Sequence, residues 1–213
     1  MRLFVLLLGL CLMLISTWSA FMWGAVEPAE RNIIYVHVPS AICSLVCFGS
    51  LFVCSIGYLR TSSDRWDHAA RACAEAGLIF ATVMNVTGMI FARAEWGVWW
   101  TVSPRLVSSA VMWFLYVGYL ILRGALAGER REGTICAVFG IIAFIDVPIV
   151  IISSRFIRDI HRPSFSFETS RQYAALGLSV LGALVLASAL IWMRSEILKV
   201  QTQINGIFNR RDY

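Results

Sequence analysis

Residues 3–26 read LFVLLLGLCLMLISTWSAFMWGAV, a run that contains no Asp, Glu, Lys or Arg. Five further runs share this character, with Asp146 as the one charged residue among them: residues 32–59, 76–92, 106–122, 133–154 and 172–193. The six runs are 24, 28, 17, 17, 22 and 22 residues long. A helix needs roughly 20 residues, within a range of about 17–25, to cross the hydrocarbon core of a bilayer. Each run is therefore predicted to be a membrane-spanning helix.

The composition excludes a water-soluble globular protein. Of the 213 residues, 59% are hydrophobic and 15% are charged, and the mean hydropathy is +0.73. Soluble domains contain about 25% charged residues, and a domain of this size still exposes roughly a third of its unfolded surface. The apolar runs are continuous rather than alternating, which excludes the strands of a membrane β-barrel.

The predicted fold is an all-α integral membrane protein, a bundle of six transmembrane helices joined by short loops. We expect residues 1–213 to form a single membrane domain. The expected spans are, approximately, residues 3–23, 37–58, 75–92, 105–122, 134–154 and 173–193.

The first run has two interpretations. Arg2, the apolar stretch and Ser19-Ala20 resemble a secretory signal peptide. The stretch continues through Phe21, Met22 and Trp23, however, and is longer than the usual apolar region of such a signal. We therefore expect an uncleaved first helix.

The distribution of positive charge predicts the orientation in the membrane. With the N-terminus inside, the inner segments hold eleven Lys and Arg residues and the outer segments hold seven. Because positive loops are retained on the cytoplasmic side, both termini are predicted to be cytoplasmic. The net charge of +5 then reflects topology and requires no nucleic-acid partner.

The outer side carries the residues whose side chains are best suited to bind a metal or cofactor. Two of the three histidines are expected there: His37 at the mouth of the second span, and His161 in the third outer loop. Between them in sequence lies a tryptophan-rich loop, residues 92–105. Two neutral imidazoles can ligate one metal axially, and histidine is a common ligand of haem iron. The sequence contains no Cys-x-x-Cys-His, so a covalent c-type haem site is not expected.

The loop and its neighbours suit a flat macrocycle with two propionates. Three tryptophans within five residues supply a broad apolar surface, and outer arginines can form two-pronged contacts with carboxylates. These arginines are Arg105, Arg155, Arg158 and Arg162. The plainer interpretations are an aromatic belt at the membrane boundary and arginines that bind lipid phosphate.

The inner side is expected to be less informative. Its loops, residues 59–74 and 123–133, are short and rich in Arg, Asp and Glu. We interpret these charges as solvated faces and topology signals, and His68 as an ordinary polar residue.

Asp146 stands out because it lies near the middle of the fifth span. Pro148, two residues later, removes a backbone donor and favours a kink. A carboxylate within the membrane is a candidate functional residue. The plainer interpretation is a protonated or hydrogen-bonded structural residue that faces Thr82, Asn85 or Thr87 of the third span.

Three segments together resemble a known family. Residues 96–108, WGVWWTVSPRLVS, resemble the WGxWWxWDxRLxS signature of the haem-handling proteins of cytochrome c assembly. Residues 31–39, RNIIYVHVP, resemble the YxHVP stretch of the same proteins. Residues 146–149, DVPI, followed by His161, resemble their fifth span and third outer loop. With six spans in a short chain, the whole sequence resembles the haem exporter protein C (CcmC) family.

The resemblance implies that haem b is held non-covalently at the periplasmic face, over the tryptophan-rich loop. It implies two axial ligands, His37 and His161, and a set of cofactor-binding residues: Trp96, Gly97, Trp99, Trp100 and Arg105. It also implies a place in the bacterial inner membrane and three kinds of partner. These are the subunits of an ATP-driven haem transporter, a small one-span accessory subunit and a periplasmic haem chaperone. A protein that presents haem needs no catalytic residue, so a delivery factor is expected rather than a conventional enzyme.

Val102-Ser103 stands where the family pattern has Trp-Asp. The aromatic surface thus loses a ring, and the site loses an acidic group. This departure supports an alternative: a cofactor-free membrane subunit of a transporter or assembly complex that uses the aromatic loop to dock partner proteins. A bis-histidine electron carrier is a third interpretation, although such carriers usually place both ligands within spans.

Overall fold

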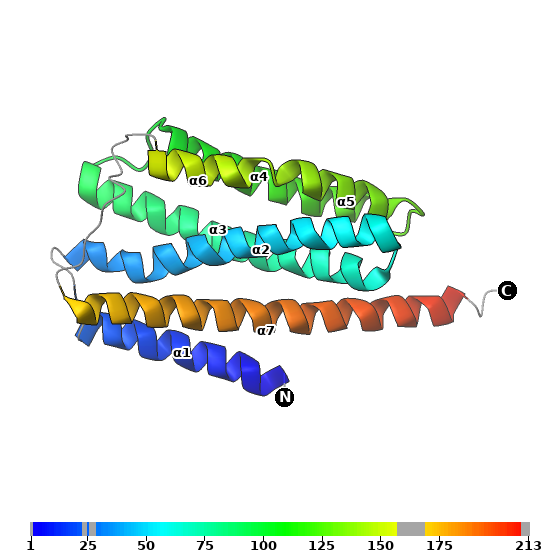
Figure 1. Ribbon diagram of the computed structural model, residues 1–213, viewed down its shortest axis with the longest axis horizontal. Helices are drawn as coiled ribbons and strands as arrows, with labels where there is room; N and C mark the ends of the chain where they lie inside the picture. Colours follow the sequence, from blue (N-terminus) through cyan, green and yellow to red (C-terminus); the bar gives the residue numbers. More distant parts are fainter. Residues whose placement is uncertain (1, 23–24, 26–28, 157–168, 210–213) are drawn as a thin grey trace.

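The computed structural model describes residues 2–22, 25, 29–156 and 169–209, and they form a bundle of long helices (Figure 1). In chain order the elements are α1 (Arg2–Met22), the short 3₁₀ helix η1 (Ala29–Ile33), α2 (Ile34–Thr61), α3 (Asp64–Trp96), α4 (Pro104–Ala125), α5 (Glu132–Ala143), α6 (Asp146–Phe156) and α7 (Ser170–Asn209). Within these ranges, six helical segments are long and apolar enough to cross a membrane, and α5 and α6 together make one of them. The prediction of an all-α membrane protein with six spans is confirmed.

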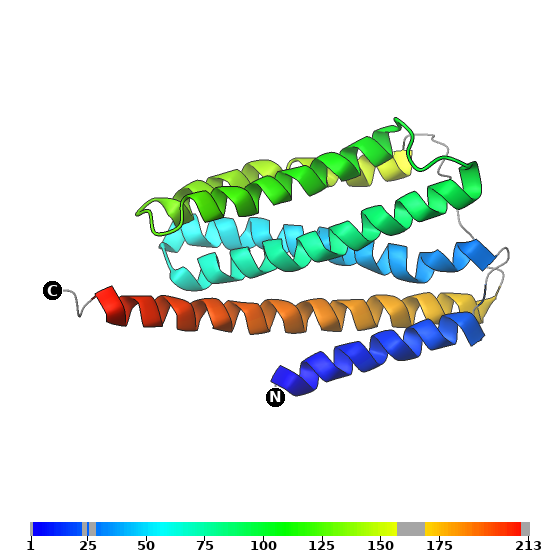
Figure 2. The ribbon, with the colours of Figure 1, turned by 180° about the vertical axis from the view of Figure 1, so that it is seen from behind.

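The helices lie side by side as three neighbouring pairs (Figures 1 and 2). The central pair is α2 and α3, which make the most extensive contact in the bundle. Helix α7 packs on this pair and carries α1 on its outer side, while α4 packs with α5 and α6 on the other side. One end of the bundle, called here the tryptophan-loop end, carries the α3–α4 loop, residues 97–103. The opposite end carries the α2–α3 turn and the α4–α5 loop.

Small residues let the helices approach closely. Gly9 of α1 lies against the backbone of Leu186 in α7, where a Cβ would come within 2.9 Å of the Leu186 Cα. Gly182 of α7 meets the backbone of Leu12 in the same way, with a Cβ distance of 3.1 Å. Helices in lipid associate through such close backbone packing, since burial of apolar surface does not drive them together there. The α1–α7 pair is therefore held by close backbone packing at Gly9 and Gly182.

The fifth span is broken in its middle, as the proline predicts. Helix α5 ends at Ala143 and α6 begins at Asp146. Pro148 has no N–H to donate to the carbonyl of Phe144, and that carbonyl instead accepts the Val147 N–H at 3.0 Å. This tighter bond, three residues apart rather than four, keeps the Phe144 carbonyl satisfied inside the membrane.

Candidate functional site

The α3–α4 loop is shaped by the residues at its two ends. Helix α3 continues to Trp96, further than the predicted loop 92–105 implies, and ends where Gly97 takes a left-handed conformation with φ of 75°. The Gly97 N–H donates to the Arg93 carbonyl at 3.1 Å, and the Arg93 guanidinium donates to the Gly97 carbonyl. Residues with a Cβ are disfavoured at this φ, so the role of Gly97 is to allow the backbone conformation that ends α3 and begins the loop.

The other end of the loop is an N-terminal helix cap. The buried Ser103 side chain accepts the Leu106 N–H at 3.3 Å, and Pro104 occupies the first turn of α4. Serine and aspartate are both strong capping residues. Ser103 therefore supplies the helix-starting function that the aspartate of the family pattern would also supply.

The three tryptophans of the loop region lie in different environments. Trp99 and Trp100 are 56% and 36% exposed at the tip of the loop. Trp96 is half-buried on the last turn of α3, with its ring edge-on to Phe91 at 5.7 Å between centroids. Trp99 and Trp100 thus present aromatic surface outward, whereas Trp96 packs within the protein.

Two further residues of the loop bear on the departure from the family pattern. Val102 is 92% exposed, so a tryptophan in its place would extend the outward aromatic surface. The buried Thr101 Oγ1 has no hydrogen-bond partner among the described residues. A buried hydroxyl without a partner is uncommon, and it leaves the loop one polar group that a bound molecule can satisfy.

His37 lies in the first turns of α2, at the same end of the bundle as the loop. Its Nδ1 is 3.1 Å from the Oγ1 of Thr87 on α3, and its side chain is half-buried. Thr87 and Trp96 are nine residues apart on α3, which at 1.5 Å per residue places His37 about 13 Å below the loop along the helix. His37 is thus set inside the bundle beneath the tryptophans.

Polar contacts hold the helices beneath the loop in register. The Ser109 hydroxyl of α4 donates to Asn85 of α3 at 3.3 Å, and the neighbouring Ser108 shares a hydrogen bond of 3.0 Å with Ser153 of α6. Further down, the Trp113 indole N–H donates to the Thr82 hydroxyl at 2.8 Å. These contacts tie α4, which carries Arg105 in its first turn, to α3 and α6.

Some of the predicted site residues are not among those described. His161, Arg158 and Arg162 lie outside the described residues. Among the predicted site residues that are described, the structure brings His37 and the tryptophan loop to one end of the bundle, with a half-buried Arg105 at the start of α4.

The residues described at this end fit haem in three respects. His37 offers an imidazole whose Nδ1 is held by the protein, which is the usual arrangement of a ligating histidine. Trp99 and Trp100 offer exposed aromatic faces, and Thr101 offers an unpartnered hydroxyl. Haem iron takes one or two ligands from the protein. His37 is one of the two predicted ligands, and it lies at this end of the bundle.

Asp146 is not hydrogen-bonded to the residues of the third span that the plainer interpretation named. Each of its three suggested partners is bonded elsewhere: Asn85 to Ser109, Thr82 to Trp113, and Thr87 to His37. Asp146 itself is 9% exposed, and its Oδ2 has no hydrogen-bond partner among the described residues. No hydrogen bond joins Asp146 to any of the three among the described residues, so the prediction that they are its hydrogen-bonding partners was wrong.

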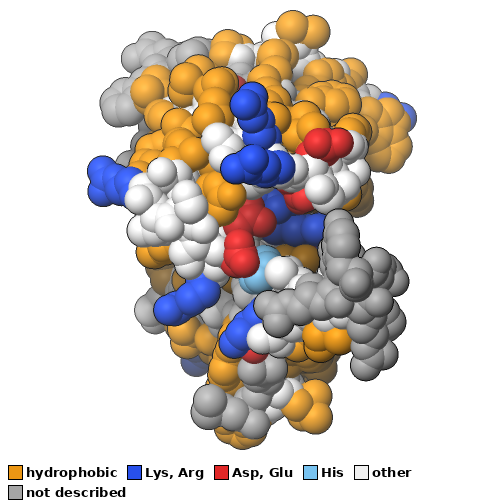
Figure 3. All heavy atoms as spheres, turned by 90° about the vertical axis from the view of Figure 1, so that its right-hand side faces the viewer, with side chains coloured by type: hydrophobic (Ala, Val, Ile, Leu, Met, Phe, Trp, Pro, Cys, Tyr) orange, Lys and Arg blue, Asp and Glu red, His pale blue; other side chains and the backbone are white. Residues whose placement is uncertain are grey.

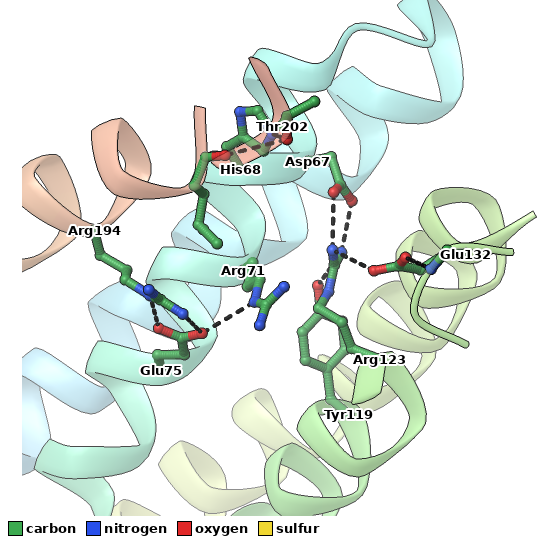
Figure 4. Close-up of polar contacts among 11 residues, drawn as sticks. Asp67, His68, Arg71, Glu75, Tyr119, Arg123, Glu132, Arg194 and Thr202 are labelled. Carbon is green, nitrogen blue, oxygen red and sulfur yellow. Dashed lines mark hydrogen bonds and ion pairs between the residues drawn. The ribbon is translucent and has the colours of Figure 1, made fainter. Parts of the chain in front are cut away.

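The opposite end of the bundle contains an ion-pair cluster that sequence reasoning missed (Figure 4). The guanidinium of Arg123 on α4 points between Asp67 of α3 and Glu132 of α5. Its Nη1 and Nη2 donate to the two Asp67 oxygens at 2.8 and 2.6 Å, and Nη2 donates to the Tyr119 hydroxyl at 3.0 Å. Arg123 is only 3% exposed, so the interpretation of this charge as solvated was wrong.

A second group of contacts joins α3 to α7 at the same end. Glu75 of α3 accepts from Arg71, one turn away, at 3.1 Å and from both Nε and Nη2 of Arg194 on α7. His68 of α3 hydrogen-bonds to Thr202 of α7 at 3.0 Å. Figure 3, which looks onto this end, shows side chains of both charges and a histidine gathered among hydrophobic ones. The only sequence signal was the spacing of acidic residues along the start of α3, which does not reveal their partners.

The fold and the site together define a multi-pass membrane protein with a histidine and an exposed tryptophan loop gathered at one end. The protein belongs to the Heme exporter protein C family, whose family model matches residues 2–212. This family serves heme transport in cytochrome c biogenesis, and its bacterial members together with the six apolar helices indicate a multi-pass protein of the bacterial inner membrane. The resemblance seen in the sequence is confirmed.

Individual relatives match over most of the chain. Heme exporter protein C of Escherichia coli K12 is 31% identical over 184 residues, which cover 82% of this chain and 75% of the relative. Heme exporter protein C of Haemophilus influenzae is 28% identical over 207 residues, covering 88% and 82%. A ccmC-like mitochondrial protein of cytochrome c biosynthesis from Marchantia polymorpha is 29% identical over 168 residues, covering 75% and 69%.

Proposed function

We propose that this protein binds haem b at the periplasmic face of the membrane and passes it on for cytochrome c maturation. The observation that carries the proposal is the position of His37 beneath the exposed Trp99 and Trp100, at one end of a chain of the Heme exporter protein C family. A ligand and an aromatic surface at one end of the bundle are what presentation of a flat, iron-centred group requires.

The tryptophan-loop end faces the periplasm in this proposal, and both termini are cytoplasmic. The excess of Lys and Arg at the opposite end supports this orientation, because positively charged loops are retained in the cytoplasm. The exposed tryptophans then lie at the outer interface, where amphipathic rings are favoured.

Each site residue has a distinct part. His37 and His161 would hold the haem iron, and His37 would bind it through Nε2 because its Nδ1 faces Thr87. Haem, when bound, supplies the iron centre to which these imidazoles coordinate. Trp99 and Trp100 cover the apolar face of the ring, and Arg105 pairs with a propionate. Trp96 and Gly97 support the loop: Trp96 packs on Phe91, and Gly97 ends α3.

The partners follow from the same function. A protein that presents haem outside the membrane needs a source and an acceptor, and we propose an ATP-driven transporter with a one-span accessory subunit on the membrane side. A periplasmic haem chaperone is the proposed acceptor. The protein itself makes and breaks no covalent bond, so it acts as a delivery factor and not as a conventional enzyme.

The visible absorption spectrum of the purified protein tests the proposal. We expect a Soret band with low-spin bis-histidine features in the wild type, weakened or shifted in His37→Ala and in His161→Ala. His68→Ala is the matched control, because His68 lies at the opposite end and bonds to Thr202. The His68→Ala spectrum should equal that of the wild type. A colourless wild type that also takes up no added haem would overturn the proposal.

The tryptophans give a second, independent test. Trp99→Leu should weaken haem affinity with little change in thermal stability, because that side chain is 56% exposed. Trp100→Leu should weaken haem affinity with a somewhat larger change in stability, because that side chain is 36% exposed. Trp96→Leu should lower stability first, since its ring packs on Phe91. Equal loss of haem affinity and of stability in all three variants would contradict the separate roles.

The second candidate function is a cofactor-free subunit that docks partner proteins through the same loop. The 92% exposure of Val102, where the family pattern has a tryptophan, favours it, because an apolar side chain so exposed suits a protein contact. Val102→Asp distinguishes the two functions. A docking surface would lose partner capture in pull-down experiments, whereas a haem site would keep its spectrum.

A further inference from the structure

The hydroxyl of Thr87 makes three polar contacts, and one of them is with His37. Thr87 Oγ1 lies 2.7 Å from the Val83 carbonyl oxygen and 3.1 Å from the Met84 carbonyl oxygen, both in the preceding turn of α3. It lies 3.1 Å from His37 Nδ1. The hydroxyl therefore sits between two acceptors on its own helix and one ring nitrogen on α2.

The single proton of this hydroxyl determines the direction of each bond. A threonine hydroxyl has one proton to donate and two lone pairs that accept. A carbonyl oxygen only accepts, so the contact with Val83 at 2.7 Å requires the Thr87 proton. Thr87 must then accept from His37, and the proton on the imidazole must lie on Nδ1. The opposite arrangement would leave two oxygens at 2.7 Å without a proton between them.

Thr82, five residues earlier on α3, shows the same arrangement with a donor of known direction. Its hydroxyl donates to the Leu78 carbonyl at 2.8 Å and accepts the Trp113 indole N–H at 2.8 Å. An indole nitrogen can only donate. Thr82 thus demonstrates that a threonine on this helix can bond back to its own turn and still accept a ring N–H from a neighbouring helix.

Gly88 provides the space in which the imidazole ring lies. A Cβ at this position would come within 3.2 Å of His37 Cε1 and 3.7 Å of Nδ1. Any side chain at Gly88 would therefore press on the ring edge that faces α3. Thr87 and Gly88 form a seat for the imidazole on two consecutive residues of α3.

We infer that Thr87 is a positioning residue: it holds the proton of His37 on Nδ1, and so makes Nε2 the nitrogen that binds iron. The inference rests on the proposed function and extends it to a residue outside the ligand set. A hydrogen bond to the distal N–H of a ligating histidine fixes the ring orientation and raises the basicity of the ligand.

The tautomer can be measured without haem. We propose ¹⁵N NMR of histidine-labelled protein in detergent, with the His37 signals assigned by their loss in His37→Ala. The wild type should show a protonated Nδ1 and an unprotonated Nε2 for neutral His37. Thr87→Val, which keeps the shape of the side chain and removes the hydroxyl, should populate both tautomers. A wild type with the proton on Nε2 would overturn the inference.

Haem titration of the same variants gives the second readout. Loss of such a hydrogen bond weakens metal binding by about 10–100-fold, so Thr87→Val should raise the Kd for haem by about that factor. The reduction potential of the bound haem should also rise, because a less basic imidazole stabilises ferric iron less. Thr87→Ser restores the hydroxyl and should behave as the wild type.

Thr82→Val is the matched control, since it removes the equivalent hydroxyl from the Trp113 contact on the same helix. It should leave haem affinity and potential unchanged. If Thr87→Val also binds haem with wild-type affinity and potential, the positioning role is wrong while the haem site stands. If neither the wild type nor any variant binds haem, the proposed function fails, and the NMR result still reports the tautomer separately.

Discussion

Arg123 and Asp67 form a two-pronged ion pair between the end of α4 and the start of α3, with N–O distances of 2.6 and 2.8 Å. The Arg123 side chain is 3% exposed and that of Asp67 is 20% exposed. Glu132 of α5 lies 3.5 Å from the same guanidinium. One nearly buried cation thus links three helices at the opposite end from the tryptophan loop.

Removal of the Asp67 carboxylate should be strongly destabilising. Asp67→Asn leaves the Arg123 charge buried with a weaker partner, and breaking a buried pair in this way costs about 3–5 kcal/mol. Unfolding in detergent, followed by circular dichroism, measures the loss. Glu95→Gln is the matched control, because Glu95 pairs with Arg31 at 3.1 Å with both side chains more than a quarter exposed. Exposed pairs contribute about 0–1 kcal/mol, so equal losses in the two variants would contradict the prediction.

The close backbone packing at Gly9 and Gly182 predicts that one added methyl group disturbs the α1–α7 pair. Gly9→Ala places a Cβ within 2.9 Å of the Leu186 backbone, so the helices must move apart. Overpacking of this kind costs about 1–3 kcal/mol. Among the described residues, no atom of a neighbouring helix lies within 4 Å of a Cβ placed on Gly177 of α7, so Gly177→Ala should instead stabilise by about 0.5–1 kcal/mol. Thermal unfolding of both variants in detergent checks the opposite signs, and a rise in Tm for Gly9→Ala would contradict the packing.

The helix cap formed by Ser103 leads to a prediction about this position, where the family pattern has an aspartate. Ser103→Ala removes the acceptor of the Leu106 N–H and should cost about 0.5–2 kcal/mol. Ser103→Asp restores both a capping oxygen and the acidic group of the pattern, and should match or exceed wild-type stability. Unfolding measurements decide the matter, and an alanine variant as stable as the wild type would exclude a capping role.

The unpartnered oxygen of Asp146 predicts a gain in stability on its removal. Asp146→Leu replaces a buried carboxyl with an apolar group of similar length, and an unsatisfied buried polar group costs about 1–3 kcal/mol. We therefore expect a higher Tm in detergent. Haem binding and cytochrome c assembly in the same variant show whether the carboxyl serves function. A lower Tm would mean that the carboxyl has a stabilising partner.

The membrane spans could be predicted from sequence because each is defined by a local, continuous apolar run. The break near Pro148 was predictable for the same reason, since a missing N–H acts on its own helix turn. His37 and the tryptophans could be assigned to one end of the bundle by counting spans. Such inferences need only the order of residues along the chain.

Contacts between distant residues could not be predicted in this way. Arg123 looked like a solvated charge because its partner Asp67 is 56 residues away, and only the register of α3 against α4 brings them together. Thr87 looked like a partner for Asp146, but the α2–α3 register gives its hydroxyl to His37. Helix registers depend on packing over whole faces, which a single sequence does not reveal.

The pairing of α1 with α7 has a consequence for the making of the protein. Helix α1 packs along α7 and touches α2 only slightly, so helices α2 to α6 lie between α1 and its partner in the chain. During synthesis the glycine-bearing face of α1 has no partner helix until α7 has also been made. Helices in membranes associate after they have inserted. The α1–α7 pair therefore closes only after α2 to α6 have been made, and a chain cut short before α7 leaves α1 without its main partner helix.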